Sequence, residues 1–153
     1  MIISVELNLK KILKLKRKFK WPRPKICPKC RGHKVWGHGF VLANFDGFKL
    51  SLYIKRYRCP NCLTVMRMRP GEYFPRFQAS IKTIRSSILN KSTRNFWSKT
   101  ICRVRQQHWF RALIRRISAF LGNNFKYSVL EGFDYLMSKK INPVSRSFKS
   151  AIN

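Results

Sequence analysis

Two Cys-x-x-Cys pairs limit the possible folds of this chain more than any other feature. Cys27 and Cys30 form the first pair, and Cys59 and Cys62 form the second. The two-residue gap within a pair allows a tight turn that brings both thiolates to one cation, and two such turns complete a tetrahedron of sulfur ligands. The sequence therefore predicts one structural Zn²⁺ ion bound by all four cysteines.

Four sulfur ligands leave no coordination position for water, so metal-activated hydrolysis is not expected at this ion. The alternatives are a redox dithiol or an iron site, but two paired turns favour zinc. His33 lies close to Cys30 and is a candidate substitute ligand, although an ordinary strand histidine is favoured. Cys102 stands apart from the pairs, and a small buried side chain is the favoured interpretation.

The segment between the two pairs has the pattern of strands. Apolar residues lead into Asp46-Gly47, whose residue types accept the positive φ angles of a tight primed turn. Beyond it, Leu52 and Ile54 alternate with more polar positions, and a third strand over 64–69 ends at Pro70-Gly71. We expect a zinc ribbon made of β hairpins over residues 21–75.

The apolar period changes to that of helices after residue 78. The pattern predicts helices at about 81–90, 93–99, 102–121 and 125–140, and the first three are compatible with a helix-turn-helix unit. The longest helix carries an apolar stripe and ends at Gly122. The stripe consists of Phe110, Leu113, Ile114, Ile117 and Leu121. The predicted fold class is α+β, with a four-cysteine zinc ribbon followed by a small helical bundle.

The flanks of this core are predicted to be less ordered, which gives four segments in all. Residues 1–20 form a basic arm, 21–75 the zinc ribbon, 76–140 a helical nucleic-acid-binding region and 141–153 a flexible tail. The arm has three interpretations: a solvated tail, an arm that tracks phosphates, and a helix on a membrane surface. Lysines dominate it from Lys10 to Lys20.

The charge of the chain indicates its partner. Lys and Arg number 34 against five Asp and Glu, which gives a formal net charge of +29. So many positive charges repel one another, and a polyanion that releases its counterions on binding relieves this repulsion. The sequence therefore predicts a nucleic acid as the partner and no small-molecule substrate.

Four polar residues of the longest predicted helix recur every four positions and lie on one side of it. They are Arg103, Gln107, Arg111 and Arg115. Arg can bond guanine at two atoms and Gln can do the same with adenine, so this side has the residue types of a major-groove recognition helix. A solvated face that contacts only phosphates is the alternative. The full set of predicted nucleic-acid contacts is Lys16, Arg17, Lys18, Lys29, Arg31, Lys55, Arg56, Arg58, Arg103, Arg105, Gln107, Arg111 and Arg115.

The location of the protein in the cell is predicted from its apolar stretches, its first residues and its cysteine pairs. No stretch approaches the roughly 18 consecutive apolar residues that cross a bilayer, so no membrane span is predicted, and a membrane is not the expected partner. The first residues are apolar and the lysines follow, which is the reverse of a secretion signal. Metal-type cysteine pairs are typical of a reducing compartment. We expect a cytoplasmic, nucleoid-associated protein.

Several blocks of sequence resemble a known group of proteins. They are Trp21-Pro-Arg-Pro-Lys-Ile-Cys-Pro-Lys-Cys30, Trp36-Gly-His-Gly-Phe40, Tyr57-Arg-Cys-Pro-Asn-Cys62 and Arg105-Gln-Gln-His-Trp-Phe-Arg111. These blocks are similar to small bacterial zinc-ribbon proteins associated with transposable elements, and to the ribbon and helix-turn-helix region of insertion-sequence transposases. The resemblance covers residues 21–147 and implies binding at element ends, or assistance to a separate transposase.

The chain departs from a complete transposase because it lacks a triad of carboxylates that could hold two metal ions. We therefore expect a non-catalytic DNA-binding protein. One alternative is an RNA-binding or ribosome-associated zinc-ribbon protein. A second is a small nuclease or recombinase that uses Glu131 and Asp134, which lie three residues apart on one helix face.

Overall fold

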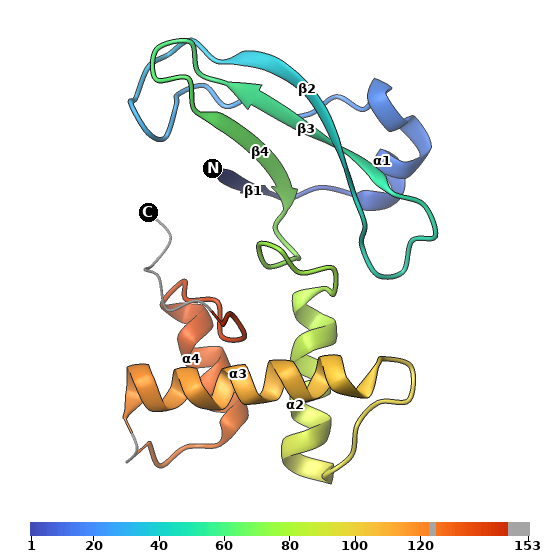
Figure 1. Cartoon of the computed structure of the whole chain (residues 1–153), viewed down its shortest axis with the longest axis vertical. Helices are drawn as coiled ribbons and strands as arrows, with labels where there is room; N and C mark the ends of the chain where they lie inside the picture. Colours follow the sequence, from blue (N-terminus) through green and yellow to red (C-terminus); the bar gives the residue numbers. More distant parts are fainter. Residues whose placement is uncertain (123–124, 147–153) are drawn as a thin grey trace. The chain divides into compact units, whose positions relative to one another are not determined.

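The computed structural model describes residues 1–122 and 125–146, and the chain divides into two units, Met1–Ser80 and Ile81–Asn153. The first unit is built on a β-sheet and the second on helices, which makes the fold α+β (Figure 1). This boundary lies close to the position where the apolar period changes from two to about 3.6. The structure therefore has two units, whereas the sequence predicted four segments. The differences concern residues 1–20 and the predicted tail.

The central strands of the first unit coincide with the predicted extended segments. They are β2 (Trp36–Ala43), β3 (Leu52–Arg58) and β4 (Val65–Pro70), joined in antiparallel fashion. The predicted tight turn at Asp46-Gly47 lies instead inside a longer connection over 44–51. Gly47 has a φ of +87°, whereas Asp46 is not among the residues with positive φ. The connection turns inward because Phe45 packs edge-to-face on Tyr73, with ring centroids 4.7 Å apart.

The largest difference from the sequence prediction concerns residues 1–20. Strand β1 (Ile2–Val5) pairs with β4 in parallel, so the four-stranded sheet has the order β1-β4-β3-β2. Helix α1 (Leu9–Leu15) begins at Asn8, whose Oδ1 accepts a hydrogen bond from the Lys11 N–H at 3.1 Å. A short 3-10 helix, η1 (Lys16–Lys18), follows. The predicted arm is therefore part of the first unit.

The spacing of apolar side chains explains why α1 packs on the sheet. Leu9 and Ile12 lie one helical turn apart, and Ile12 is fully buried. They join Leu52 and Ile54 of β3 in one apolar cluster. A second cluster contains Tyr57, Met66 and Met68 with Cys27, Val35 and Cys59. Because Tyr57 opposes Met66 and lies an odd number of residues from Ile54, the two clusters occupy opposite faces of the sheet.

The second unit contains three helices in the residues that the structure describes. These are α2 (Ile81–Arg94), α3 (Arg103–Leu121) and α4 (Val129–Ser138). The predicted helix at 93–99 is wrong. Helix α2 continues to Arg94, and an irregular connection then leads to Cys102. The predicted arrangement of a helix-turn-helix is therefore not observed at these residues.

The buried face of α3 is rotated from the predicted stripe. Trp109, Leu113 and Ile117 are buried, whereas Ile114 is 40% exposed. The buried face also contains two polar side chains, Gln106 and Arg116, which the apolar stripe did not include. Gly122 follows the helix with a φ of +80°, and its N–H donates to the Ser118 carbonyl, as its position predicted.

Part of the predicted flexible tail is packed. Val144 is buried, and Arg116 Nε donates to the Ser145 carbonyl at 2.9 Å. Residues 147–153, which complete this prediction, lie outside the described residues. Among the helices that can be assessed in the described ranges, none combines the length and the apolarity that crossing a bilayer requires.

Candidate metal centre and basic surfaces

The four cysteines of the two pairs lie together in the first unit. Their Sγ atoms all lie within 4.8 Å of one another. Cys27 Sγ is 3.7 Å from Cys62 Sγ, and Cys30 Sγ is 3.5 Å from Cys59 Sγ. A regular tetrahedron with metal–sulfur bonds of about 2.3 Å has edges of about 3.8 Å. The cluster therefore has dimensions compatible with one tetrahedral ion, and all four thiols are free of disulfide bonds.

The two pairs form turns with the same backbone pattern. The Cys27 N–H donates to the Gly32 carbonyl at 2.9 Å, and the Cys59 N–H donates to the Thr64 carbonyl at 3.0 Å. The residue after each second cysteine, Arg31 or Leu63, has a φ of 56° or 58°. A left-handed backbone at these positions reverses the chain directly after the ligand. Each pair is therefore presented by an equivalent turn, one before β2 and one between β3 and β4.

Hydrogen bonds within the turns give the thiols different pKa values. The Thr64 hydroxyl, 3.3 Å from Cys62 Sγ, and the Thr64 N–H stabilise the thiolate and lower the pKa of Cys62 to about 6. The Cys30 N–H lowers the pKa of Cys27 in the same way. At Cys30 the Gly32 N–H favours the thiolate, but the neighbouring thiols of Cys59 and Cys62 outweigh it and raise the pKa to about 12.

The sequence also singled out one candidate substitute ligand, His33, and the fifth cysteine, Cys102. His33 is exposed and is not part of the metal-ligating group found in the described residues. It lies in a bend before β2, so its interpretation as a strand histidine was wrong. Cys102 was expected to be buried on a helix. It is instead exposed and directly precedes α3 at the N-cap position. The prediction was wrong because the helix begins one residue later than its apolar pattern suggested.

The predicted basic contacts of the first unit come from three places. Lys16, Arg17 and Lys18 form η1 and are exposed, with the Arg17 guanidinium 5.1 Å from the ring centroid of Tyr53. Lys29 and Arg31 lie in the first cysteine turn and are exposed.

The remaining cations, Lys55, Arg56 and Arg58, lie on β3 and are half-buried. Lys55 Nζ lies 4.4 Å from the Phe40 ring centroid. Strands β2 and β3 therefore bring cations next to aromatic rings.

The predicted nucleic-acid contacts of the second unit lie at two different places on helix α3. Arg103, Arg111 and Arg115 are exposed, and Gln107 beside them is half-buried. These four residues lie opposite the buried face of the helix. Arg105 lies elsewhere, with its guanidinium 5.2 Å from the ring centroid of the buried Trp109. Trp109 is a core residue.

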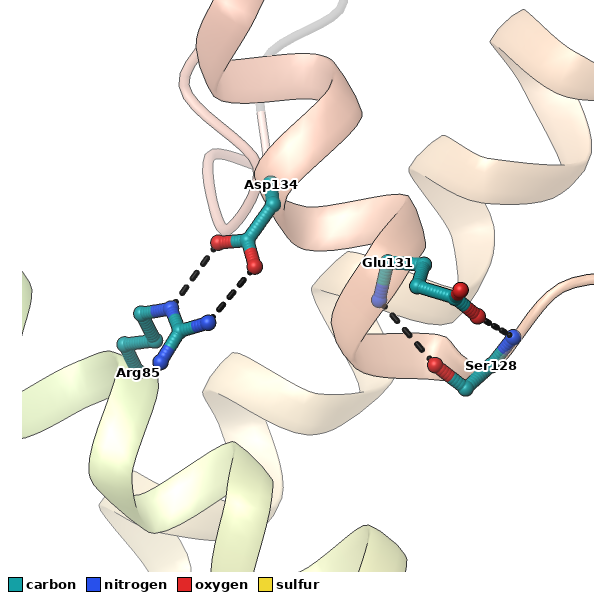
Figure 2. Close-up of polar contacts among 4 residues, drawn as sticks. All are labelled: Arg85, Ser128, Glu131 and Asp134. Carbon is teal, nitrogen blue, oxygen red and sulfur yellow. Dashed lines mark hydrogen bonds and ion pairs between the residues drawn. The ribbon is translucent and has the colours of Figure 1, made fainter.

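The two carboxylates considered for catalysis each have a separate partner (Figure 2). Asp134 accepts two hydrogen bonds from Arg85, at 2.8 and 2.6 Å, and these bonds lower the pKa of Asp134. Glu131 Oε2 accepts from the Ser128 N–H at 2.7 Å, and the Glu131 N–H donates to Ser128 Oγ at 3.2 Å. This capping box begins α4 and lowers the pKa of Glu131.

Sequence reasoning missed the role of Gln106. It is fully buried, its Oε1 accepts from Ser87 Oγ at 2.8 Å and from the Ser98 N–H at 3.1 Å, and its Nε2 donates to the carbonyls of Ser98 and Ile101, each at 2.8 Å. These bonds hold the irregular connection that replaces the predicted middle helix. The available signal was its position, three residues before Trp109 and seven before Leu113.

Comparison of the chain with protein-family models, with curated proteins and with solved structures found no match in any of the three.

Proposed function

We propose that this protein is a non-catalytic DNA-binding protein whose first unit is a zinc ribbon held by one structural Zn²⁺ ion at Cys27, Cys30, Cys59 and Cys62. The observation that supports duplex binding most directly is the exposed row of Arg103, Arg111 and Arg115 beside Gln107, opposite the buried face of α3. These side chains can reach phosphates and base edges from one rigid helix.

The four-cysteine cluster supports the structural role of the metal. Four sulfur ligands at tetrahedral distances fill the coordination shell of Zn²⁺, so the ion stabilises the turns and activates no water. The turn residues Lys29 and Arg31 are exposed beside the cluster. Their cations therefore supply phosphate contacts, while α3 supplies the base contacts that determine preference.

The resemblance to transposon-associated proteins gives the proposal its biological setting. In this setting the protein acts in the cytoplasm on the nucleoid, where it binds element ends or assists a separate transposase. The test is the DNA that flanks the coding sequence. Inverted repeats enclosing a transposase gene beside it support the association, and their absence from several genomic copies contradicts it.

RNA is the second candidate, because β2 and β3 carry rings next to cations. The rings of Phe40 and Tyr53 are half-buried and lie edge-to-face with centroids 6.3 Å apart, and Lys55 and Arg17 lie over them. Aromatic residues on a sheet are typical platforms for the stacking of single-stranded bases.

A competition experiment distinguishes the two nucleic acids. Labelled duplex DNA bound to the metal-loaded protein is displaced by unlabelled duplex DNA or by an RNA hairpin of equal length, at one fixed salt concentration. The proposal predicts that the RNA hairpin competes less effectively than the duplex. Stronger competition by RNA contradicts DNA binding as the main function and favours the second candidate.

The non-catalytic assignment has its own test. Glu131 and Asp134 are the carboxylates proposed for a nuclease, and both already have structural partners. The double variant Glu131→Ala and Asp134→Ala is compared with the wild type for cleavage of DNA in the presence of Mg²⁺. We expect no cleavage by either protein. Cleavage by the wild type that the variant loses contradicts the proposal.

A further inference from the structure

Four arginines of the central strands share one face of the sheet. Arg56 of β3 lies directly opposite Arg67 of β4. Because successive side chains of a strand point to opposite faces, Arg58 and Arg69, two residues further along, lie on the same face as this pair. Arg67 and Arg69 were not among the predicted nucleic-acid contacts, because the alternation of β4 does not show which residues of β3 oppose them.

The pair has an unfavourable arrangement in the protein alone. Like charges directly opposite on neighbouring strands destabilise a sheet. The Nε atoms of Arg56 and Arg67 are buried, and neither has a hydrogen-bond partner among the described residues. The three strands β2, β3 and β4 contain no Asp or Glu. Two arginines at opposed positions of neighbouring strands therefore have buried Nε donors and no carboxylate from these strands.

The Arg56 guanidinium lies beside Gly39 of β2, and a third arginine of the same face, Arg69, is held by its own contacts. Gly39 of β2 has a φ of +70°, and a side chain there would point to within 3.8 Å of Arg56 Nη2. Arg69 is almost fully buried, its Nη2 donates to the Phe77 carbonyl, and its guanidinium lies 5.4 Å from the ring centroid of Phe45. Arg69 is therefore anchored within the unit, whereas Arg56 and Arg67 are half-buried.

We propose that Arg56 and Arg67 form a binding site for a phosphate oxyanion, and that its ligand is a phosphodiester group of a bound nucleic acid. The Nε–H and one Nη–H of a guanidinium form a planar fork that matches two oxygens of a phosphate. A phosphate bound at this face of the sheet offers acceptors to the two Nε–H groups and neutralises the like charges that lie opposite each other on neighbouring strands. The identification of the ligand rests on the proposed function, whereas the site rests on the pair itself.

The experiment uses the full-length, metal-loaded protein. The double variant Arg56→Lys and Arg67→Lys keeps both charges but loses the Nε donors and the planar forks. A matched control, Lys25→Gln with Lys34→Gln, removes two charges from exposed positions of the same unit. The measured quantities are the affinity for a short DNA duplex by fluorescence anisotropy, the affinity for an RNA hairpin of equal length, and the midpoint of thermal unfolding with and without inorganic pyrophosphate.

We expect the arginine variant to lose about tenfold in affinity for the nucleic acid that the wild type prefers, since each guanidinium fork contributes charge-assisted hydrogen bonds. We expect the control to lose less, although its net charge is lower. Pyrophosphate is expected to raise the unfolding midpoint of the wild type and of the control, but not of the arginine variant. Without pyrophosphate, the arginine variant is expected to unfold no earlier than the wild type.

Two results overturn the site. One is equal nucleic-acid affinity of the wild type and the arginine variant, which leaves the proposed function intact. The other is an earlier unfolding midpoint of the arginine variant with an unchanged response to pyrophosphate, which assigns the pair a structural role. If the wild type binds neither nucleic acid, the proposed function fails. The response to pyrophosphate then still decides whether the pair is a site for a free phosphate compound.

Discussion

Individual polar residues determine much of the second unit. Gln106 uses its donors and its acceptor on Ser87, Ser98 and Ile101, so a connection without regular structure is held by one side chain. A buried amide in this position cannot be exchanged for a hydrocarbon without leaving several backbone groups unpaired. Its neighbour Gln107 lies on the other side of the helix and is half-buried rather than enclosed.

The variant Gln106→Leu is expected to destabilise the second unit by about 2–4 kcal/mol, since buried donors and acceptors lose their partners. Chemical denaturation followed by the fluorescence of the tryptophans measures this change. The control Gln107→Leu is expected to stay within about 0.5 kcal/mol of the wild type. Equal losses for the two variants would show that the contacts of Gln106 contribute little.

The thiol acidities predict how metal binding depends on pH. Cys30, with a pKa of about 12, carries a proton at neutral pH in the metal-free protein, and Zn²⁺ must displace it. Cys62, with a pKa of about 6, is a thiolate at neutral pH but binds a proton below this value. Metal and protons compete, so affinity falls as pH falls.

We expect apparent Zn²⁺ affinity to fall at least about tenfold per pH unit near neutrality, and more steeply below about pH 6, where a further proton competes. Competition with a zinc-binding dye at several pH values measures this dependence. The variant Thr64→Val removes the hydroxyl near Cys62 and is expected to move the steeper region to higher pH. An affinity that does not change with pH would be incompatible with thiolate ligands.

At the level of elements, α1 shows how a basic segment becomes part of a core. Its lysines are exposed, whereas Leu9 and Ile12 cover the face of β3 that carries Leu52 and Ile54. The stripe is only two residues long, and composition alone cannot distinguish it from a tail with scattered apolar residues. Pairing of β1 with β4 adds backbone hydrogen bonds that hold the segment in place. Its inclusion therefore depends on the sheet, which the local sequence does not encode.

The variant Ile12→Ala is expected to destabilise the first unit by about 2–5 kcal/mol, because it leaves a cavity between α1 and β3. The variant Leu15→Ala on the same helix is the control, since Leu15 is 44% exposed. Thermal unfolding of the metal-loaded protein compares the two. An unchanged unfolding midpoint in the Ile12→Ala variant would contradict the packing of α1 and support the predicted solvated arm.

Across the whole molecule, the sequence predicted features that depend on local spacing and missed those that depend on distant partners. The cluster of four cysteines, the three strands and the longest helix follow from short-range patterns. Three features each depend on a residue more than ten positions away: the pairing of β1 with β4, the hydrogen bond of Gln106 with Ser87, and the register that places Arg56 opposite Arg67. Cys102 and Ile114 were predicted to be buried but are exposed, because a shift of one residue along a helix moves a side chain from the buried face to the exposed one.

Metal removal tests whether the two units fold separately. Two of the four metal-site cysteines, Cys27 and Cys59, are buried in an apolar cluster of the first unit, so chelation is expected to unfold this unit. The second unit has a core without metal ligands in its described residues. Hydrogen exchange of the amides is expected to lose protection in β2–β4 and to keep it in α2–α4. The variant Cys102→Ser, outside the cluster, is expected to respond as the wild type. Retained protection in the strands would show that the metal is dispensable for the fold.

The central claim is that this cationic protein holds a nucleic acid through its phosphates, and the salt dependence of binding tests it most directly. Binding of a DNA duplex to the metal-loaded protein is measured from low to physiological salt. We predict a linear fall of log affinity against log salt concentration with a slope of about −5 or steeper, as expected for about six phosphate contacts. An affinity independent of salt, or no binding in dilute buffer, would contradict the account.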